Sequence, residues 1–230
     1  MSCQQCCGIT QQFNDKAARK QLNRFRRRGP DRTTRILIDE VRRSLEDGGT
    51  RGATMLDVGA GLGAIHHVLL DGTVTHAIHV DASPAQLAAA REETHRRGHD
   101  DLVEFLEGDF TSIADRVSSA DVVTLDRVIC CFDDMEHLVR LSAQKARRLY
   151  GAVFPRDVRW MHVGIRVINV VLRLRRSPFR VFLHDPHAID AVLRSAGLHR
   201  KVERDTLGWK VVLYERRHGP EPISPSSGAW

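Results

Sequence analysis

Three glycines follow an acidic residue at the end of a short apolar run, in the sequence Met55-Leu-Asp-Val-Gly-Ala-Gly-Leu-Gly-Ala-Ile65. The apolar run with Asp57 is typical of a strand, and Gly59, Gly61 and Gly63 predict a tight turn that leads into a helix. Glycine allows a backbone to approach a ligand closely or to adopt positive φ. This segment therefore predicts a site for a nucleotide-like cofactor.

The spacing of this turn distinguishes it from two other nucleotide-binding turns. A dinucleotide site has G-x-G-x-x-G, with the pyrophosphate at a helix N-terminus, and a P-loop requires Gly-Lys-Ser/Thr. The chain has Asp-x-Gly-x-Gly-x-Gly instead and contains no Gly-Lys-Ser/Thr. The carboxylate of Asp57 would repel a pyrophosphate, whereas it would suit a ligand that carries an ammonium or sulfonium group.

Two further acidic residues lie where the next predicted strands end. Asp81 and Ala82 stand in His79-Val-Asp-Ala-Ser83, and Asp109 precedes Phe110 in the sequence Glu-Gly-Asp-Phe. A carboxylate at 81 can accept both hydrogen bonds of a ribose diol, and one at 109 can accept from an adenine amino group that an apolar neighbour covers. The structural alternatives are a helix cap at Asp81 and an ordinary loop aspartate at Asp109.

In chain order, these residues resemble the motifs of the class I S-adenosylmethionine-dependent methyltransferases. Asp126, in Leu125-Asp-Arg-Val128, occupies the position of the fourth motif. The resemblance implies S-adenosylmethionine as the cofactor, with these binding residues: Asp57, Gly59, Gly61, Gly63, Asp81, Ala82, Asp109, Phe110 and Asp126. The chain lacks Asn/Asp-Pro-Pro-Tyr/Phe and Pro-Cys, the signatures of the best-known nucleobase methyltransferases.

Alternating apolar runs and helical patterns over residues 52–157 predict a parallel α/β sheet. We expect strands at about 53–58, 74–81, 102–107, 120–125, 150–155, 200–206 and 210–216, and helices at about 62–71, 84–97, 111–117, 134–148 and 186–196. The short connection between the last two strands implies an antiparallel hairpin. The predicted fold class is α/β, a Rossmann-like, seven-stranded, mostly parallel sheet with an antiparallel C-terminal hairpin.

The predicted organisation adds two helical segments to this core. Residues 1–51 form an N-terminal helical cap, with one or two helices in 12–47 that break at Gly29-Pro30, and residues 52–217 form the methyltransferase domain. A helical insertion at 158–184 carries polar residues at spacings of three and four. We expect it either to pack its apolar surface on the core or to cover the active site as a lid. Residues 218–230 are predicted to be disordered.

Two residues outside the cofactor motifs are candidates for catalysis. His184 could act as a general base, because an imidazole titrates near neutral pH. Arg156, at the end of the fifth predicted strand, could hold an acidic acceptor by a bidentate contact. The alternatives are a packed histidine beside the helix cap Asp185, and a surface ion pair between Arg156 and Asp157.

Composition bounds the partners and the compartment. No apolar run is long enough to span a membrane, no signal peptide is recognisable, and five cysteines in an odd arrangement make a poor disulfide framework, so we expect a cytoplasmic protein. The cysteine spacing fits no common zinc pattern, and we predict no metal site. Residues 1–51 contain 12 Lys and Arg against 6 Asp and Glu, and residues 158–230 contain 13 against 6. Residues 52–157 contain 10 Lys and Arg against 17 Asp and Glu.

These basic flanks suggest an anionic partner. We therefore expect a methyltransferase acting on a small, anionic acceptor, with oligomeric state left open. The alternatives are an RNA or tRNA methyltransferase, disfavoured by the few aromatic residues in the flanks, and a non-catalytic cofactor-binding module.

A wider resemblance extends over about residues 6–217. The chain is similar to bacterial proteins grouped near magnesium-protoporphyrin O-methyltransferase. The residues that carry this likeness are Cys6-Cys-Gly8, Arg26-Arg-Arg-Gly-Pro-Asp31, Leu125-Asp-Arg-Val-Ile-Cys-Cys131, Pro155-Arg156 and Phe182-Leu-His184. It implies the fold and the cofactor, but not the acceptor.

Overall fold

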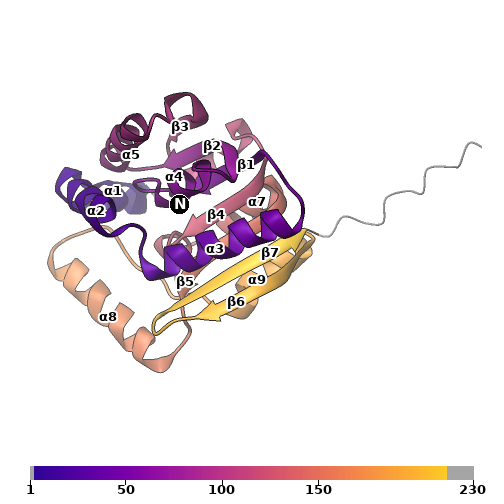
Figure 1. Cartoon of the computed structure of the whole chain (residues 1–230). Helices are drawn as coiled ribbons and strands as arrows, with labels where there is room; N and C mark the ends of the chain where they lie inside the picture. The colour runs from indigo at the N-terminus through magenta and orange to yellow at the C-terminus, as the bar shows by residue number, and fades with distance from the viewer. Residues whose placement is uncertain (1–2, 217–230) are drawn as a thin grey trace, which may run out of the picture.

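A central seven-stranded sheet organises the protein in a computed structural model that describes residues 3–216 (Figure 1). The strands are β1 (Ala53–Val58), β2 (Val74–Asp81), β3 (Val103–Glu107), β4 (Ala120–Asp126), β5 (Ala146–Pro155), β6 (Leu198–Asp205) and β7 (Trp209–Arg216). The α-helices are α1 (Cys3–Gln12), α2 (Asp15–Arg28), α3 (Arg32–Asp47), α4 (Ala64–Leu70), α5 (Pro84–Arg97), α6 (Phe110–Ile113), α7 (Met135–Lys145), α8 (Arg159–Leu174) and α9 (Pro186–Ser195).

The strand order is β3-β2-β1-β4-β5-β7-β6. The first five strands are parallel, and β7 runs antiparallel to both β5 and β6. This arrangement confirms the predicted fold class. The chain moves outward from β1 in one direction and then resumes at β4 on the other side, so the strand order switches between these two strands. Ligands of open α/β sheets bind beyond the carboxyl ends of the strands at such a switch.

Two helical layers cover the sheet. Leu37, Ile38 and Leu45 of α3 pack with Leu69 of α4 on one face, whereas α6, α7 and α9 cover the other. Each fully buried Leu or Ile contributes about 1.5–3 kcal/mol to folding. These layers leave the carboxyl edge of the parallel strands free for a site.

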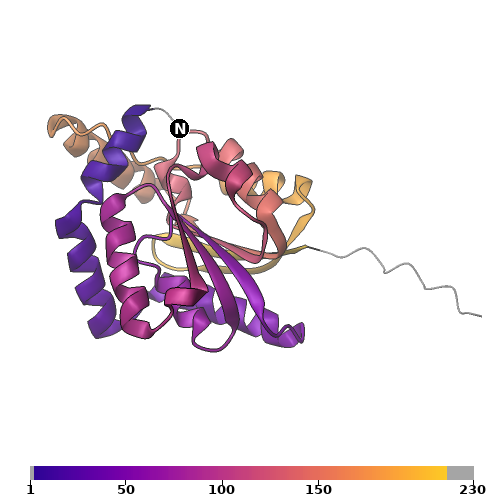
Figure 2. The same ribbon diagram turned by 90° about the horizontal axis from the view of Figure 1, so that it is seen from above.

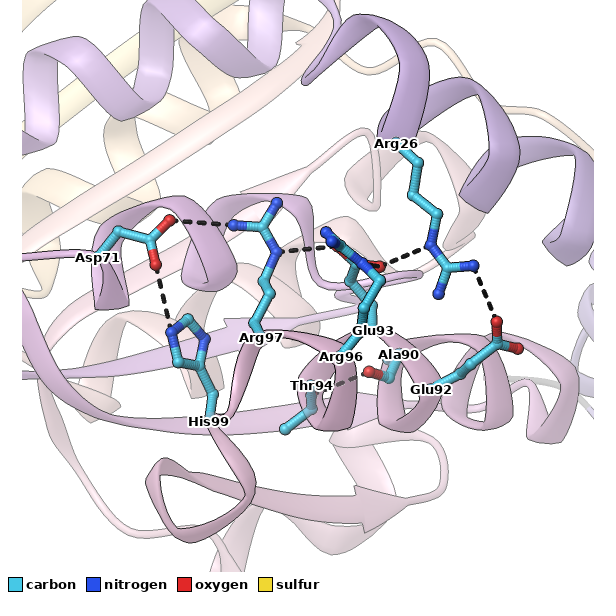
Figure 3. Close-up of polar contacts among 9 residues, drawn as sticks. All are labelled: Arg26, Asp71, Ala90, Glu92, Glu93, Thr94, Arg96, Arg97 and His99. Carbon is cyan, nitrogen blue, oxygen red and sulfur yellow. Dashed lines mark hydrogen bonds and ion pairs between the residues drawn. The ribbon is translucent and has the colours of Figure 1, made fainter.

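The N-terminal cap is attached to the edge of the domain. Ala18 and Leu22 of α2 pack against Ala89 of α5, and the two helices lie side by side (Figure 2). Arg26 of α2 also forms ion pairs with Glu92 and Glu93 of α5 (Figure 3). The predicted break at residues 29–30 separates α2 from α3, whereas α1 was not predicted as a separate helix.

The predicted helix starts follow from local capping. Ser83 accepts a hydrogen bond from the Gln86 N–H at 3.3 Å, and Pro84 occupies the first turn of α5. Asp185 caps α9 in the same way, accepting from the His187 N–H at 2.8 Å. The side chain of Asp185 therefore has the capping role that the sequence offered as an alternative.

Two predicted helix ends were wrong. The helix expected at 111–117 is α-helical over Phe110–Ile113 and continues as a 3-10 turn over Ala114–Arg116. The helix expected at 134–148 ends at Lys145, and β5 begins directly at Ala146. Ala146 pairs with Ala120 and Leu149 with Val122, in parallel register. Pairing with the buried strand β4 therefore outweighs the helix propensity of this segment, a tertiary effect that local sequence does not carry.

The insertion differs from the expectation that its apolar surface packs on the core. Ile165 is the buried residue of α8, and most of its other apolar side chains are exposed. The helix lies at the periphery, away from the sheet (Figure 1). No helix within residues 3–216 has both the length and the apolar composition to cross a bilayer. The tail predicted to be disordered, 218–230, lies outside the described residues.

Candidate active site

A cleft of about 560 Å³ opens at the carboxyl edge of the sheet, where β1, β2 and β4 end. The predicted cofactor residues on its wall are Asp57, Gly59, Gly61, Asp81, Ala82, Asp109, Phe110 and Asp126. Gly63 lies directly after this stretch of wall, at the start of α4. The fold thus brings together motifs that are separated by up to 69 residues, from Asp57 to Asp126.

The glycine turn has the backbone that its sequence predicts. Gly59, Gly61 and Gly63 have φ values of 61°, 58° and 82°, in the left-handed region that favours glycine. A Cβ at Gly59 would lie 2.6 Å from Val128 Cγ2, and one at Gly63 would lie 2.3 Å from His66 Cε1. A Cβ at Gly61 would come no nearer to another side chain than 3.7 Å, from Gln86 Oε1. The first and third glycines are therefore required by packing. The second has no side chain that would project into the cleft.

Asp57 is buried beneath this turn. Its Oδ1 accepts a hydrogen bond from Thr124 Oγ1 at 2.7 Å, and its Oδ2 lies 3.2 Å from His66 Nδ1. Burial raises the pKa of Asp57 to about 7, although the Thr124 hydrogen bond lowers it. A cation bound in the cleft would favour the ionised carboxylate. The side chain therefore both fixes the turn and contributes acidic character beneath it.

Asp81 connects the end of β2 to the glycine turn. Its Oδ2 accepts from the Gly61 N–H and its Oδ1 from the Ser83 N–H, each at 2.8 Å. Burial raises its pKa to about 6, and the backbone hydrogen bonds oppose this shift. Each carboxylate oxygen has a further lone pair, so Asp81 can hold the turn and still accept from a diol.

Gln86 adds a polar group that sequence reasoning missed. Its Nε2 donates to Gln21 Oε1 at 2.9 Å, whereas its Oε1 is buried on the cleft wall with no hydrogen-bond partner within the described part of the chain. A buried acceptor without a donor is costly unless a ligand or water satisfies it. Together with the open space at Gly61, this oxygen fits a polar, nucleoside-containing cofactor such as S-adenosylmethionine.

Asp109 and Asp126 have structural partners as well. Asp109 Oδ1 accepts from the N–H and the Oγ1 of Thr111 at 3.0 Å, which caps α6, and Phe110 is buried beside it on the wall. Asp126 accepts from Thr34 Oγ1 at 2.5 Å. The capping role that the sequence left open for Asp81 is performed by Ser83, and Asp109 caps α6 instead; both Asp109 and Asp126 line the cleft.

Arg127 joins the end of β4 to the start of α3 at the cleft. Its backbone has a φ of 62°, in the left-handed region, and its guanidinium bonds to Asp126 (3.0 Å), Asp31 (3.1 Å) and Thr34 (3.1 Å). The guanidinium carbon lies 6.0 Å from the centroid of the Trp209 ring. Sequence reasoning did not find this network, because Asp31 and Thr34 precede Arg127 by more than 90 residues.

The two predicted catalytic residues do not line the cleft. His184 Nε2 lies 2.8 Å from the Phe132 carbonyl oxygen, and burial lowers its pKa although backbone hydrogen bonds oppose that effect. The guanidinium of Arg156 donates to the Thr206 carbonyl at 3.0 Å and pairs with Asp205 at 3.2 Å. His184 thus contacts the segment between β4 and α7, whereas Arg156 contacts the β6–β7 hairpin and pairs with Asp205 rather than with Asp157.

The additions to the core supply the apolar part of the wall. Side chains from the N-terminal cap, the insertion and β7 contribute Ile9, Phe13, Phe25, Ile168, Phe179, Val181 and Trp209. Apolar residues carry no local signal for ligand contact, so sequence reasoning could not select them. The polar stripe of α8 does not reach the cleft, whose walls hold Arg24 and Arg127 instead.

Two adjacent cysteines also contribute to the cleft. Cys130 and Cys131 line the cleft and are free thiols, as is the exposed Cys7. The side chains of Cys3 and Cys6 are not among those described. In the described part of the chain, no three side chains of the metal-binding types converge on a common point.

Residues 56–148 match the model of a methyltransferase domain family. Together with the sheet order and the glycine turn at the switch, this match defines the class. Residues 56–148 are similar to methyltransferase domains, and the sheet that contains them has the fold of the class I S-adenosylmethionine-dependent methyltransferases.

Solved structures of this fold extend the similarity beyond the matched residues. A magnesium protoporphyrin IX methyltransferase from Synechocystis, solved with S-adenosylhomocysteine, is 17% identical and covers 91% of this chain and 100% of its own, with a TM-score of 0.67. An O-methyltransferase family protein from Burkholderia thailandensis is 19% identical, over 90% of this chain and 62% of that one, with a TM-score of 0.66. At these identities the likeness concerns the fold. A search of curated proteins finds no match to the sequence.

Proposed function

We propose that this protein transfers a methyl group from S-adenosylmethionine to a small acceptor with an apolar body. The observation that carries the proposal is the glycine turn at Gly59–Gly63, connected to Asp81 at the switch in strand order. When bound, the cofactor supplies a methyl group already activated by its sulfonium. The protein then contributes mainly positioning and the exclusion of water.

We assign the predicted binding residues to three parts of the cofactor. The turn at Gly59–Gly63 would face the methionine part, Asp81 with Ala82 would accept the ribose diol, and Asp109 with Phe110 would meet the adenine. Asp57 favours the cationic end through its negative charge. The free acceptor on Gln86 Oε1 supports this division, because it offers one more hydrogen bond close to Asp81.

The acceptor enters between the cap and the insertion. This side of the cleft is lined by Phe13, Phe179 and Trp209, which favour an apolar or aromatic body. An anionic group was expected from the basic flanks, and Arg24 and Arg127 are the cations on the wall. Both already pair with Asp31, at 2.6 and 3.1 Å, so recognition of an anion would require them to exchange that partner.

Catalysis in this proposal does not use His184 or Arg156, since neither lines the cleft. The cap and the insertion cover the reacting groups and exclude water, as a lid would. The free thiols at Cys7, Cys130 and Cys131 support a cytoplasmic location.

A transfer assay with radiolabelled S-adenosylmethionine tests the proposal. Extracted metabolites, fractionated by polarity and charge, and total RNA are offered separately. We expect label in apolar metabolites and none in RNA, with transfer only weakly dependent on salt. Label in RNA with a steep salt dependence would favour the nucleic-acid alternative, because each neutralised phosphate releases counterions. Cofactor binding without transfer to any fraction would favour a non-catalytic module.

A further inference from the structure

The exposed apolar side chains of this protein are concentrated on one helix. Eight large hydrophobic residues are exposed in the described part of the chain, and seven of them belong to α8: Trp160, Val163, Val167, Ile168, Val170, Val171 and Leu174. Val163 keeps 61% of its surface exposed and Leu174 keeps 79%. A contiguous apolar surface of this kind indicates an interaction site.

The geometry of α8 places most of these residues on one side. With 3.6 residues per turn, Val163, Val167, Val170, Val171 and Leu174 share a face with Trp160. We call these six residues the α8 face. The helix is held to the protein from the other side, where Ile165 is buried and the side-chain amide of Asn169 exchanges hydrogen bonds with the Val181 backbone at 2.7 and 2.9 Å.

The turn of the β6–β7 hairpin extends this surface. A Cβ at Gly208 would lie 2.9 Å from Met161 Cε and 3.1 Å from Trp160 Cη2, so the turn contacts the start of α8. Its neighbour Leu207 is 83% exposed and is the eighth exposed hydrophobic residue. Two segments separated by more than 40 residues thus present apolar side chains next to one another.

Positive charge borders the α8 face. Residues 158–184 contain six arginines and no Asp or Glu. Arg159, Arg166 and Arg173 recur every seventh residue along one edge of the face, and Arg175 and Arg176 follow the end of the helix. Within residues 3–216, none of these five exposed arginines has an acidic partner, in contrast to Arg24, Arg127 and Arg156 in the body of the protein.

We propose that the α8 face and Leu207 dock on the surface of an anionic lipid bilayer. An apolar face with a Trp and a border of arginines is the composition of a helix that lies in the plane of a membrane interface. The helix has 16 residues, about 24 Å, and its axis would run along the surface. The arginines would meet the anionic headgroups while the valines enter the acyl boundary.

Two other occupants fit the same surface less well. A second copy of the chain would bring rows of unpaired arginines together, because α8 contains no acidic residue to oppose them. RNA would pair with the arginines but would leave five aliphatic side chains unburied, with Trp160 as the only aromatic ring of the face for stacking.

Docking would connect the bilayer to the active site. Ile168 of α8, with Phe179 and Val181 of the following loop, lines the cleft. The surface that meets lipid and the wall of the cleft are therefore formed by the same insertion. This consequence rests on the proposed function, whereas the docking itself does not.

Vesicle co-sedimentation of the full chain tests the proposal, with phosphatidylcholine alone and with about 30% phosphatidylglycerol added. We expect binding to the anionic vesicles only, weakening as salt is raised. Val163→Ser with Val167→Ser should reduce partitioning at least tenfold, and Arg166→Glu with Arg173→Glu should abolish it. The charge-matched control, Arg19→Glu with Arg28→Glu on exposed positions of α2, should stay within twofold of wild type.

A second measurement reports insertion directly. Tryptophan emission should shift to the blue on adding anionic vesicles, and Trp160→Phe should remove that shift while still binding. Unchanged calorimetric affinity of every variant for S-adenosylhomocysteine separates docking from the proposed function. Equal binding to neutral vesicles, or full binding by the serine variant, would overturn the proposal. So would a dimer that forms without lipid and that the serine substitutions dissociate.

Discussion

At the scale of single residues, the candidate site depends on carboxylates that have two roles. Asp81 receives the Gly61 and Ser83 N–H groups and also faces the cleft. Asp57 fixes the turn through Thr124 and His66, and a cation bound in the cleft would favour its ionised form. A substitution at either position therefore affects binding and the shape of the turn together.

Replacing Asp81 by Ala should weaken the binding of S-adenosylhomocysteine more than a hundredfold. Two hydrogen bonds to a charged acceptor contribute about 1.5–3 kcal/mol each. Asp81→Asn should lie between this variant and wild type, because its amide oxygen still accepts one backbone N–H. Isothermal titration calorimetry measures the effect, with Asp115→Ala, an exposed aspartate, as the control. An unchanged dissociation constant would refute the ribose assignment.

Beneath the turn lies a cluster of histidines that the sequence motifs did not single out. His66, His67 and His79 are fully buried, and both ring nitrogens of His67 and of His79 have no hydrogen-bond partner in the described chain. Burial lowers the pKa of His66 to about 3 and that of His67 to about 2. The cluster is therefore neutral in the folded protein at every moderate pH.

His67→Leu should flatten the acid side of the stability profile. The unfolded histidine protonates below about pH 6.5 whereas the folded one does not, so His67 costs stability as pH falls from 6.5 towards 2. At pH 5 this cost is about 2 kcal/mol. Urea unfolding at pH 7 and pH 5 measures the difference, with exposed His187→Gln as the control.

The raised pKa values of Asp57 and Asp81 have the opposite effect on stability: they increase the free energy of unfolding as pH falls. Each binds its proton more tightly when folded, so each favours the folded state as pH falls through 7 and 6. Since all variants share these two groups, the comparison isolates His67. Parallel profiles for His67→Leu and wild type would contradict the prediction.

At the scale of elements, the position of the cap depends on one buried carboxylate. Glu93 of α5 is fully buried and bonds to Arg26 of α2 and to Arg96 and Arg97 of its own helix (Figure 3). Burial by itself raises its pKa, but the hydrogen bonds from the three arginines outweigh burial and hold the pKa well below its usual range. The group thus remains ionised and joins cap to core.

Glu93→Gln should lower the free energy of unfolding by about 2 kcal/mol, because three partly exposed arginines lose their hydrogen bonds to a buried, charged acceptor. Limited proteolysis should cut the loop before α3 more rapidly. Glu92→Gln is a matched control: Glu92 pairs with the same Arg26 at 2.9 Å but is half exposed, so its loss should cost no more than about 1 kcal/mol. Equal effects of the two variants would show that Glu93 is not specially important.

At the scale of the whole molecule, cofactor binding should couple the cap, the sheet and the insertion, because all three line the same cleft. A ligand at a hundredfold excess over its dissociation constant stabilises the folded state by about 2.7 kcal/mol. For a chain of this size, that corresponds to a rise of about 5–10 °C in the melting temperature. Thermal unfolding with S-adenosylhomocysteine should show the rise, and an equal concentration of a nicotinamide dinucleotide should not.

The sheet class, the cofactor family and the helix starts at Ser83-Pro84 and Asp185-Pro186 could be predicted from the amino-acid sequence. These features depend on local chemistry: glycines at positive φ, N-cap side chains, and apolar runs of strand length. The roles of individual cofactor residues remain predictions, although the fold brings these residues to one cleft.

The other groups that surround the cleft could not be predicted, because they come together only when the chain folds. Gln86, Arg127 with Asp31, and the apolar wall are brought together by packing between segments far apart in the chain, and no local pattern encodes such contacts. The same reason applies to α8: its periodicity predicts an amphipathic helix, but not which side meets the protein. Asn169 and Ile165 fix that choice and leave the α8 face in solvent.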